Sequence, residues 1–441
     1  MLVCGIDIGT TNLKVALFNE SNSLVWLRTE ATPRIHDGYG PLTDAANLLR
    51  TIEGMIVEGW RERGEGRPIQ AIASAGVGED GLFVDSSLEP LGPAIPWFDL
   101  RARTEAVELA ACAAATPRAG IAIDPTRSAA KWLWSARHTP QIVATAHTWL
   151  CLTDFPLASW AGKPFISDTL ASRTGCFDPA ARRWIDPLLA ASRAPHLPPV
   201  VTAGEVIGIV QSPSLLRSGA VSGDTLLIAG GHDHPVATHA VHQLAKSARV
   251  DSMGTANVLY GDAPAFVVDL FDPLIAFAAS IEGPKNIGCL GVFEFTAAVN
   301  RYPGGIDAIR GLLALPKMPG QPGDLGGAPF TTERQLLEWS TMNARRMLER
   351  LRGYGVPDGP IFVTGGWSRS RALVELRASV FGEAIHVPEQ RELSVLGASL
   401  FAARAVGRST DFETPITVVE PIDAWRRAYA DSFARLSANG L

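Results

Sequence analysis

The first chemically informative stretch is "GIDIGTTNLK", residues 5–14, which lies between the apolar runs "MLVC" and "VALF". A polar, glycine-containing segment between two apolar runs predicts a tight turn that joins two strands. Backbone N–H groups in such a turn can hold an anion, and a carboxylate beside them, here Asp7, is the usual partner of Mg²⁺ on a phosphate. The stretch therefore indicates a phosphate site, with an ordinary hairpin as the alternative. Its further donors are Gly9, Thr10, Thr11, Asn12 and Lys14.

Two later stretches repeat this kind of local sequence. "RVDSMGTANVLYG" again places a Gly-Thr turn, Gly254 and Thr255, between apolar strand residues. "PIFVTGGWSRS" runs from a strand into Gly365-Gly366 and on to a helix that begins near Arg371. A strand that feeds a glycine pair at a helix N-terminus suits a nucleotide. The repeated turn favours a duplicated nucleotide-binding fold, and a chance repeat is the alternative.

Hydrophobic patterning predicts the elements that position these stretches. Strands are expected in "LVCGIDI", "KVALFN", "LVWLRTEA" and "IQAIASAGV", with a helix at residues 44–63 before the last of them, which predicts a mixed sheet with a covering helix. Helices are expected in "ARTEAVELAACAAA" and in "SAAKWLWSARH", where Trp132 and Trp134 are packing residues.

The second half begins with a turn at Ser222-Gly223-Asp224, followed by the buried strand "TLLIAG". Further on, "TTERQLLEWSTMNARRMLERLRGYG" predicts a long amphipathic helix, and "ELSVLGASLFAARAVG" a helix whose small residues permit close packing. We place the boundary between two domains at this turn, so that the domains span residues 1–222 and 223–441.

Composition limits the class of function. A chain of 441 residues with 46% hydrophobic and 19% charged residues is a globular protein of about two domains. A net charge of −6 argues against a general nucleic-acid surface. The five cysteines show no C-x-x-C spacing, and we find no targeting signal or membrane-length apolar run, so we expect reduced thiols and a cytoplasmic location. A small-molecule substrate is expected, without nucleic-acid or membrane partners, and a homodimer is allowed for.

Several ordered stretches resemble the FGGY family of carbohydrate kinases: "GIDIGTTNLK", "PWFDLRA", "AGGHDHPVATHA", "DSMGTANV" and "VTGGWSRSRALVELRASVFG", with "ELSVLGASLFAARAVG" closing the chain. The resemblance spans nearly the whole sequence. It implies an α/β fold of two ribonuclease-H-like (actin-like ATPase) domains flanking a catalytic cleft, with a sugar-binding domain at 1–222 and an ATP-binding domain at 223–441. It also implies transfer of the γ-phosphoryl group of ATP to a hydroxyl of a small sugar or polyol, for which we expect a ketopentose-like acceptor.

The resemblance assigns roles to particular residues. Asp233 matches the general base of the family, and Mg²⁺ would lie near Asp7 and Asp233. In phosphoryl transfer the protein mainly positions the attacking oxygen and neutralises charge, and the carboxylate accepts a proton from the alcohol as the bond to phosphorus forms. The residues expected to bind ATP are Asp7, Gly9, Thr10, Thr11, Asn12, Lys14, Gly254, Thr255, Gly365, Gly366 and Ser368.

On the sugar side, "PWFDLRA" matches the W-x-D-x-R arrangement of relatives. Asp99 is expected to accept hydrogen bonds from sugar hydroxyls, Trp97 to face the carbon chain, and Arg101 to orient Asp99. Glu79 and Asp80 occupy the slot where many xylulose kinases carry a Met-His pair, so the match to that substrate class is broken there. We expect both carboxylates to contact hydroxyls, with a solvated loop as the alternative. For "PWFDLRA" the alternative is a surface turn.

His232 and His234 flank Asp233 and suggest a zinc hydrolase as a competing hypothesis. In an extended strand the two imidazoles share one face and Asp233 points to the other, which disfavours a common metal. We therefore expect both histidines to pack near the sugar or to tune the pKa of Asp233, with ordinary satisfied polar groups as the alternative. A nucleotide-binding regulatory protein of the same fold, without sugar turnover, is the other alternative.

Overall fold

The computed structural model describes residues 1–114, 117–254, 256–264, 272–293, 295–315, 322–323 and 332–438. The chain divides into two compact units. The first unit contains Met1–Leu244, Pro264–Gly288 and Glu392–Glu413, and the second contains Ala245–Ala263, Cys289–Arg391 and Thr414–Leu441. The predicted boundary at residues 222 and 223 lies inside a strand of the first unit, Val221–His232, and the assignment of sugar and ATP to separate domains stays a prediction.

The first unit is built on a six-stranded sheet in the order β13-β14-β6-β1-β2-β3. Strand β6 pairs in parallel with both β1 and β14, and the other neighbours in the sheet are antiparallel. The carboxyl ends of β1, β6 and β14 therefore meet at one edge of the sheet, which is where ligands bind in open α/β sheets. The strands are β1 (Val3–Ile8), β2 (Asn12–Phe18), β3 (Leu24–Ala31), β6 (Ile69–Gly76), β13 (Val206–Ile209) and β14 (Val221–His232).

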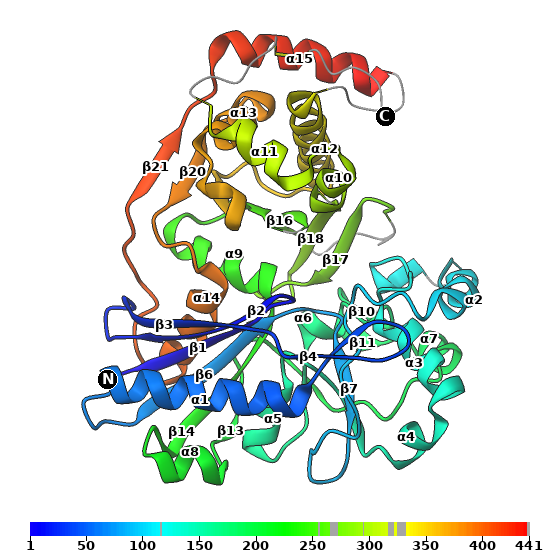
Figure 1. Cartoon of the computed structure of the whole chain (residues 1–441), viewed down its shortest axis with the longest axis vertical. Coiled ribbons are helices and arrows are strands. Elements are labelled where there is room, and N and C mark those ends of the chain that lie inside the picture. The colour runs from blue at the N-terminus through cyan, green and yellow to red at the C-terminus, as the bar shows by residue number, and fades with distance from the viewer. Residues whose placement is uncertain are drawn as a thin grey trace. The chain divides into compact units, whose positions relative to one another are not determined.

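Helices cover both faces of this sheet. Figure 1 shows α1 (Ala45–Arg63) on one side, and α9 (Asp233–Leu244) with α14 (Leu393–Ala405) on the other. A side chain on Gly397 of α14 would place its Cβ 2.1 Å from the backbone oxygen of Val236 in α9, so glycine is what lets the two helices pack this closely. The small residues of "ELSVLGASLFAARAVG" thus have the predicted packing role.

A second hydrophobic core lies in the same unit, around Trp132, Trp149 and Phe177. Strands β7 (Gly81–Val84) and β8 (Thr148–Cys151) pair antiparallel within this region. Its helices are α2 (Arg103–Ala114), η1 (Pro117–Ala119), α3 (Ser128–His138), α4 (Pro140–Thr145) and α7 (Asp186–Ala191). The remaining elements of the unit are β4 (Arg34–His36), β5 (Pro41–Thr43), α5 (Phe155–Ala161), β9 (Ile166–Ser167), α6 (Asp168–Ala171), β10 (Phe177–Asp178), β11 (Arg183–Trp184), β12 (Val200–Val201), α8 (Pro213–Ser218) and β17 (Ile275–Ala279).

In the second unit, strands lie side by side in the order β18-β16-β15-β19-β20-β21. Strand β19 pairs in parallel with β15 and β20, so a second parallel core mirrors that of the first unit. The strands are β15 (Arg249–Met253), β16 (Asn257–Pro264), β18 (Asn286–Phe293), β19 (Ile361–Thr364), β20 (Ile385–Pro388) and β21 (Ile416–Val419). The helices are α10 (Phe295–Arg301), α11 (Gly305–Leu313), α12 (Glu333–Gly353), η2 (Gly366–Arg369), α13 (Arg371–Phe381) and α15 (Asp423–Ala438).

Most predicted elements are confirmed, including the opening hairpin, the helix at 44–63 and the long helix α12. The turn predicted at Ser222-Gly223-Asp224 is wrong, because β14 continues through these residues and the pairing with β6 shifts register between Val221 and Leu226. Among the described residues, none of the helices combines the length and the apolar character that a membrane span requires.

Candidate active site

The opening hairpin positions two opposite charges side by side. Asp7 on β1 and Lys14 on β2 are directly paired across the antiparallel ladder, and the Gly9 N–H closes the turn on the backbone oxygen of Asn12 at 3.0 Å. Thr10 and Thr11 therefore form the tip of the turn. The predicted phosphate loop is thus the turn of a β-hairpin, and its donors follow the carboxyl end of β1.

Lys14 is held by two carboxylates. Its Nζ lies 2.6 Å from Oε2 of Glu392 and 3.8 Å from Oδ2 of Asp7. Burial raises the pKa of Asp7 to about 7; Lys14 opposes this rise, and the nearby carboxylates of Asp233 and Glu392 add to it. The site therefore contains more negative charge than Lys14 alone neutralises.

Asp233 lies on the same edge of the sheet as Asp7. It is the first residue of α9, immediately after β14 ends, and the strand register places His232 of β14 and Ile8 of β1 beside the same residue of β6, Gly76. Asp7 lies in β1 and Asp233 directly follows β14, and these two strands flank the parallel strand β6. The structure thus brings together the residues predicted for catalysis and for metal binding.

The two neighbouring histidines also face Asp233. Oδ1 of Asp233 lies 3.3 Å from Nε2 of His232 and 3.6 Å from Nε2 of His234, and it accepts a hydrogen bond from the His234 backbone N–H at 2.8 Å. The expectation that Asp233 points away from both imidazoles is wrong, because the strand ends at His232 and a helix begins at Asp233. Burial lowers the pKa of His232 to about 3, so this imidazole is neutral at physiological pH.

Two different donor sets at this edge fit a cation. Asp7 and Asp233 offer carboxylate oxygens, which Mg²⁺ prefers. Burial and the neighbouring carboxylates disfavour the charged form of Asp7, and a divalent cation would stabilise that form. Ligand atoms of His232, Asp233 and His234 lie within 4.8 Å of one another, and imidazole with carboxylate suits zinc. The oxygen set therefore fits the predicted Mg²⁺, and the nitrogen-containing set fits a softer ion.

The predicted sugar-side residues connect to the hairpin. The indole N–H of Trp97 donates to the Thr10 hydroxyl at 2.9 Å, and the Trp97 backbone N–H donates to Oδ1 of Asp80 at 2.6 Å. Burial raises the pKa of Asp80 to about 6, with Lys131 opposing the rise. Arg101 does orient Asp99, since it donates to both carboxylate oxygens at 2.9 and 2.7 Å.

Glu79 sits between two arginines that were not predicted. Its Oε1 accepts from Nε and Nη2 of Arg173 at 3.0 and 2.6 Å, and also from Nη1 of Arg127. Burial alone would raise the pKa of Glu79, but these two guanidinium groups outweigh it and hold the pKa at about 2. The sequence signal for them was weak: each is a single arginine, in "DPTRSAA" and "ASRTG", and both lie far from Glu79 in the sequence.

The second unit contains the other predicted nucleotide residues. Gly365 follows β19 with a φ of +84°, and a Cβ there would lie 2.6 Å from the backbone oxygen of Met253 and 3.1 Å from the backbone nitrogen of Gly254. The Gly-Gly turn therefore touches the end of β15, where the second Gly-Thr turn begins. The Ser368 hydroxyl donates to the Gly365 oxygen at 2.7 Å, and Gly366 starts the short helix η2. Thr255 lies outside the described residues.

Comparison with known proteins places this site in context. Residues 2–239 match the model of the N-terminal domain of the FGGY family of carbohydrate kinases, and residues 292–406 match that of its C-terminal domain. The chain is 26% identical to a xylulose kinase of Streptomyces coelicolor, covering 93% of this chain and 88% of the relative. It is 22% identical to a gluconokinase of Bacillus subtilis, with the same coverage of 93% and 88%.

Solved structures show the same fold. A xylulose kinase from Rhodospirillum rubrum superposes with a TM-score of 0.84 at 21% identity, covering 99% of this chain and 98% of that one. A glycerol kinase from Plasmodium falciparum with ADP superposes with a TM-score of 0.81 at 15% identity, covering 100% and 98%. The α/β fold with two actin-like ATPase domains is thereby confirmed.

Proposed function

Because this chain belongs to the FGGY family of carbohydrate kinases, we propose that it transfers the γ-phosphoryl group of ATP to a hydroxyl of a small sugar or polyol, with Asp233 as the general base. Membership of the family makes the chain an ATP-dependent carbohydrate kinase. The observation that supports the role of Asp233 is its position at the first turn of α9, on the sheet edge that also presents Asp7.

The carboxylate of Asp233 is proposed to accept the proton of the attacking hydroxyl. The attacking hydroxyl becomes acidic only as its oxygen bonds to phosphorus, so in a loose transition state its proton moves late to the carboxylate. The backbone N–H of His234 and the edge of the neutral His232 imidazole hold Oδ1 of Asp233 on one side. This leaves the other carboxylate oxygen to receive the proton.

The proposed ATP-binding residues come from the opening hairpin and from the second unit. Thr10, Thr11 and Asn12 supply donors at the hairpin tip, and Lys14 supplies a positive charge for the phosphates. Asp7 and Asp233 would hold Mg²⁺, which neutralises charge on the transferring phosphoryl group. Gly254, Thr255, Gly365, Gly366 and Ser368 form the proposed contacts of the second unit with the nucleotide.

We propose a ketopentose-like carbon chain for the reacting part of the acceptor, in line with the xylulose kinases among the relatives. Trp97, Asp99 and Arg101, with Glu79, Asp80, His232 and His234, are the proposed acceptor residues. Asp80 and Asp99 are both buried, and their oxygens are partly occupied by Trp97 and Arg101. Their proposed role is therefore to fix the shape of the acceptor site as well as to contact hydroxyls.

The test is ADP release with a panel of ketopentoses, polyols and aldonates, comparing the natural chain with Asp233→Asn. Loss of a general base should lower kcat by about 10²- to 10⁴-fold. Thermal stabilisation by Mg-ATP checks that the variant still folds and binds nucleotide. Turnover of Asp233→Asn at the natural rate would overturn the assignment of the base, and nucleotide binding without any sugar turnover would favour a regulatory protein.

A further inference from the structure

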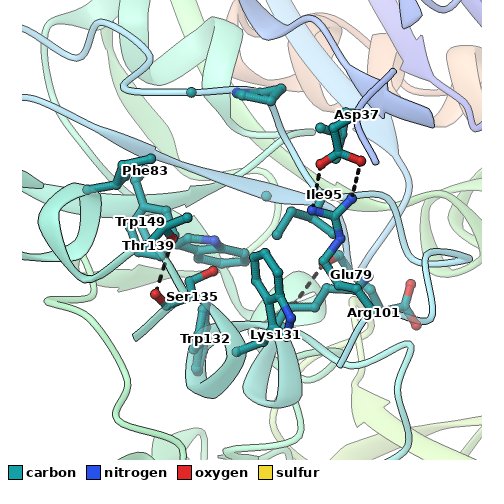
Figure 2. A pocket seen from close by; sticks show the side chains of 17 residues that line it. Asp37, Glu79, Phe83, Ile95, Arg101, Lys131, Trp132, Ser135, Thr139 and Trp149 are labelled. Carbon is teal, nitrogen blue, oxygen red and sulfur yellow. Dashed lines mark hydrogen bonds and ion pairs between the residues drawn. The ribbon is translucent and has the colours of Figure 1, made fainter. Parts of the chain in front are cut away.

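A pocket of about 170 Å³ lies in the second core of the first unit (Figure 2). It is formed by β7, β8, α3, α4 and the loop around residues 92–95. Figure 2 shows Phe83 and Trp149 on one side of the pocket and Arg101 with Asp37 on the other. The proposed function does not account for this space, although two residues of the proposed acceptor site, Glu79 and Arg101, belong to its wall.

Most of the wall is aromatic or aliphatic. Trp132 and Trp149 pack edge to face with ring centroids 5.1 Å apart, and Ile95 and Ile142 complete the apolar surface. An apolar cavity of about 150 Å³ in a protein core is large enough to bind benzene. The pocket therefore has room for a group of about one ring.

The charged groups of the wall already have hydrogen-bond or ion-pair partners within the protein. Arg101 donates to Asp37 at 2.9 and 3.2 Å as well as to Asp99. Glu79 is held by its two arginines, and Nζ of Lys131 donates to the backbone oxygen of Pro96 at 2.5 Å. A charged ligand would thus lack a free counter-charge, so the pocket selects for a neutral group.

One wall residue, Trp132, carries a buried polar atom without a partner. Trp132 is 1% exposed, and its indole Nε1 is a buried donor without a hydrogen bond to any of the described residues. Buried donors are normally satisfied, and an unsatisfied one costs free energy. A ligand with a single acceptor, such as an ether or a hydroxyl oxygen, would satisfy it.

The pocket adjoins the site of phosphoryl transfer through Glu79. A Cβ on the preceding residue, Gly78, would lie 2.5 Å from Cγ of Arg173 and 3.0 Å from the His232 ring. His232 in turn contacts Asp233. Through Glu79 and Arg101 the pocket therefore shares part of its wall with the proposed acceptor site of the same unit.

We propose that this pocket binds a neutral, apolar substituent of about ring size on the acceptor, at the end remote from the phosphorylated hydroxyl. This inference rests on the proposed function, and it narrows the acceptor to a sugar or polyol that carries such a group. A fully hydroxylated chain would leave the aromatic and aliphatic wall without an apolar partner.

The test compares two acceptors that differ only in the ring: 3-benzyloxypropane-1,2-diol and glycerol. Burial of a ring of this size should raise kcat/KM for the benzyl ether by about 10- to 100-fold over glycerol. Direct binding of 4-fluorobenzyl alcohol, followed by ¹⁹F NMR, measures occupancy of the pocket independently of turnover.

Pocket-filling variants provide the control. Gly92 lines the pocket, and a Cβ there meets nothing closer than Ile142 Cδ1 at 3.9 Å, so Gly92→Leu should enter the space and Gly92→Ala should leave most of it open. Gly92→Leu should reduce the ratio of the two kcat/KM values to about 1 and weaken fluorobenzyl alcohol binding at least 10-fold. Ile142→Phe fills the pocket from α4 if Gly92→Leu does not fold.

Sugar turnover with no preference for the benzyl ether would overturn this inference and leave the proposed function intact. Fluorobenzyl alcohol binding that survives both filling variants would overturn it as well. Binding without phosphorylation of any acceptor would count against the proposed function and would also remove the pocket from the acceptor site.

Discussion

Replacement of Asp7 by asparagine should stabilise the first unit at alkaline pH while it removes kinase activity. The Asp7 side chain is 13% exposed, and burial raises its pKa from 3.8 to about 7. Between these pH values the folded chain holds a proton that the unfolded chain has released. The free energy of unfolding therefore falls as the pH rises through this window. The loss of stability caused by ionising Asp7 in the folded chain is complete above pH 7.

The size of the effect follows from the difference in pKa. A difference of about 3 pKa units corresponds to about 4 kcal/mol, at 1.36 kcal/mol per unit. The residual exposure of the side chain and salt reduce this figure, so we expect a gain of about 2–4 kcal/mol for Asp7→Asn at pH 8. At pH 4 both side chains are neutral, and the gain should vanish.

Urea unfolding between pH 4 and 8, without Mg²⁺ or nucleotide, measures this gain. Tryptophan fluorescence is suitable because most of the eleven tryptophans lie in the first unit. Asp37→Asn is a control of opposite sign: hydrogen bonds from Tyr39, Gly40 and Arg101 outweigh its burial and lower its pKa, so its loss should destabilise at pH 8. A gain for Asp7→Asn that is the same at pH 4 and pH 8 would refute the argument.

Three further predictions test other parts of the structure. Gly365→Ala places a Cβ 2.6 Å from the Met253 backbone oxygen at a residue with positive φ, so it should destabilise the second unit by about 1–3 kcal/mol. Calorimetry should also show weaker ATP binding. In the control variant Gly366→Ala the new Cβ enters open space, so the stability should not change. Glu79→Gln removes the counter-charge of two buried arginines, and thermal or urea unfolding should show a loss of about 3–5 kcal/mol; an unchanged midpoint would show that the arginines relax into solvent. Zn²⁺ should inhibit the kinase by occupying His232, Asp233 and His234, with about 10-fold weaker inhibition of His234→Asn and recovery by chelation; equal inhibition of both proteins would exclude this site.

Local patterns predicted much of the site. Apolar runs on both sides of "DIGTTN" were enough to predict the hairpin, and the antiparallel pairing of such a hairpin is what sets Asp7 opposite Lys14. The Gly-Gly turn after β19 was predicted from a strand that runs into a glycine pair and a helix, and Gly365 has a positive φ in the structure. The α/β class followed from the alternation of strands and helices.

Pairings between distant residues were not predicted. Lys14 and Glu392 are 378 residues apart, and nothing in either local sequence indicates the other. The sequence likewise does not indicate Arg127 and Arg173 as partners of Glu79, because only the folded chain brings these residues together. The histidines beside Asp233 were misjudged because the change from strand to helix between His232 and Asp233 alters which side chains share a face.

The position of α14 in the chain has a consequence for biosynthesis. This helix packs on β1, β6 and β14, yet its residues, 393–405, leave the ribosome only after nearly all of the second unit has been made. Until then α9 alone covers part of this face of the first sheet, and exposed apolar strands invite aggregation. We therefore expect nascent chains that stop before residue 392 to depend on chaperones, and the completed chain to gain solubility abruptly once this helix is released.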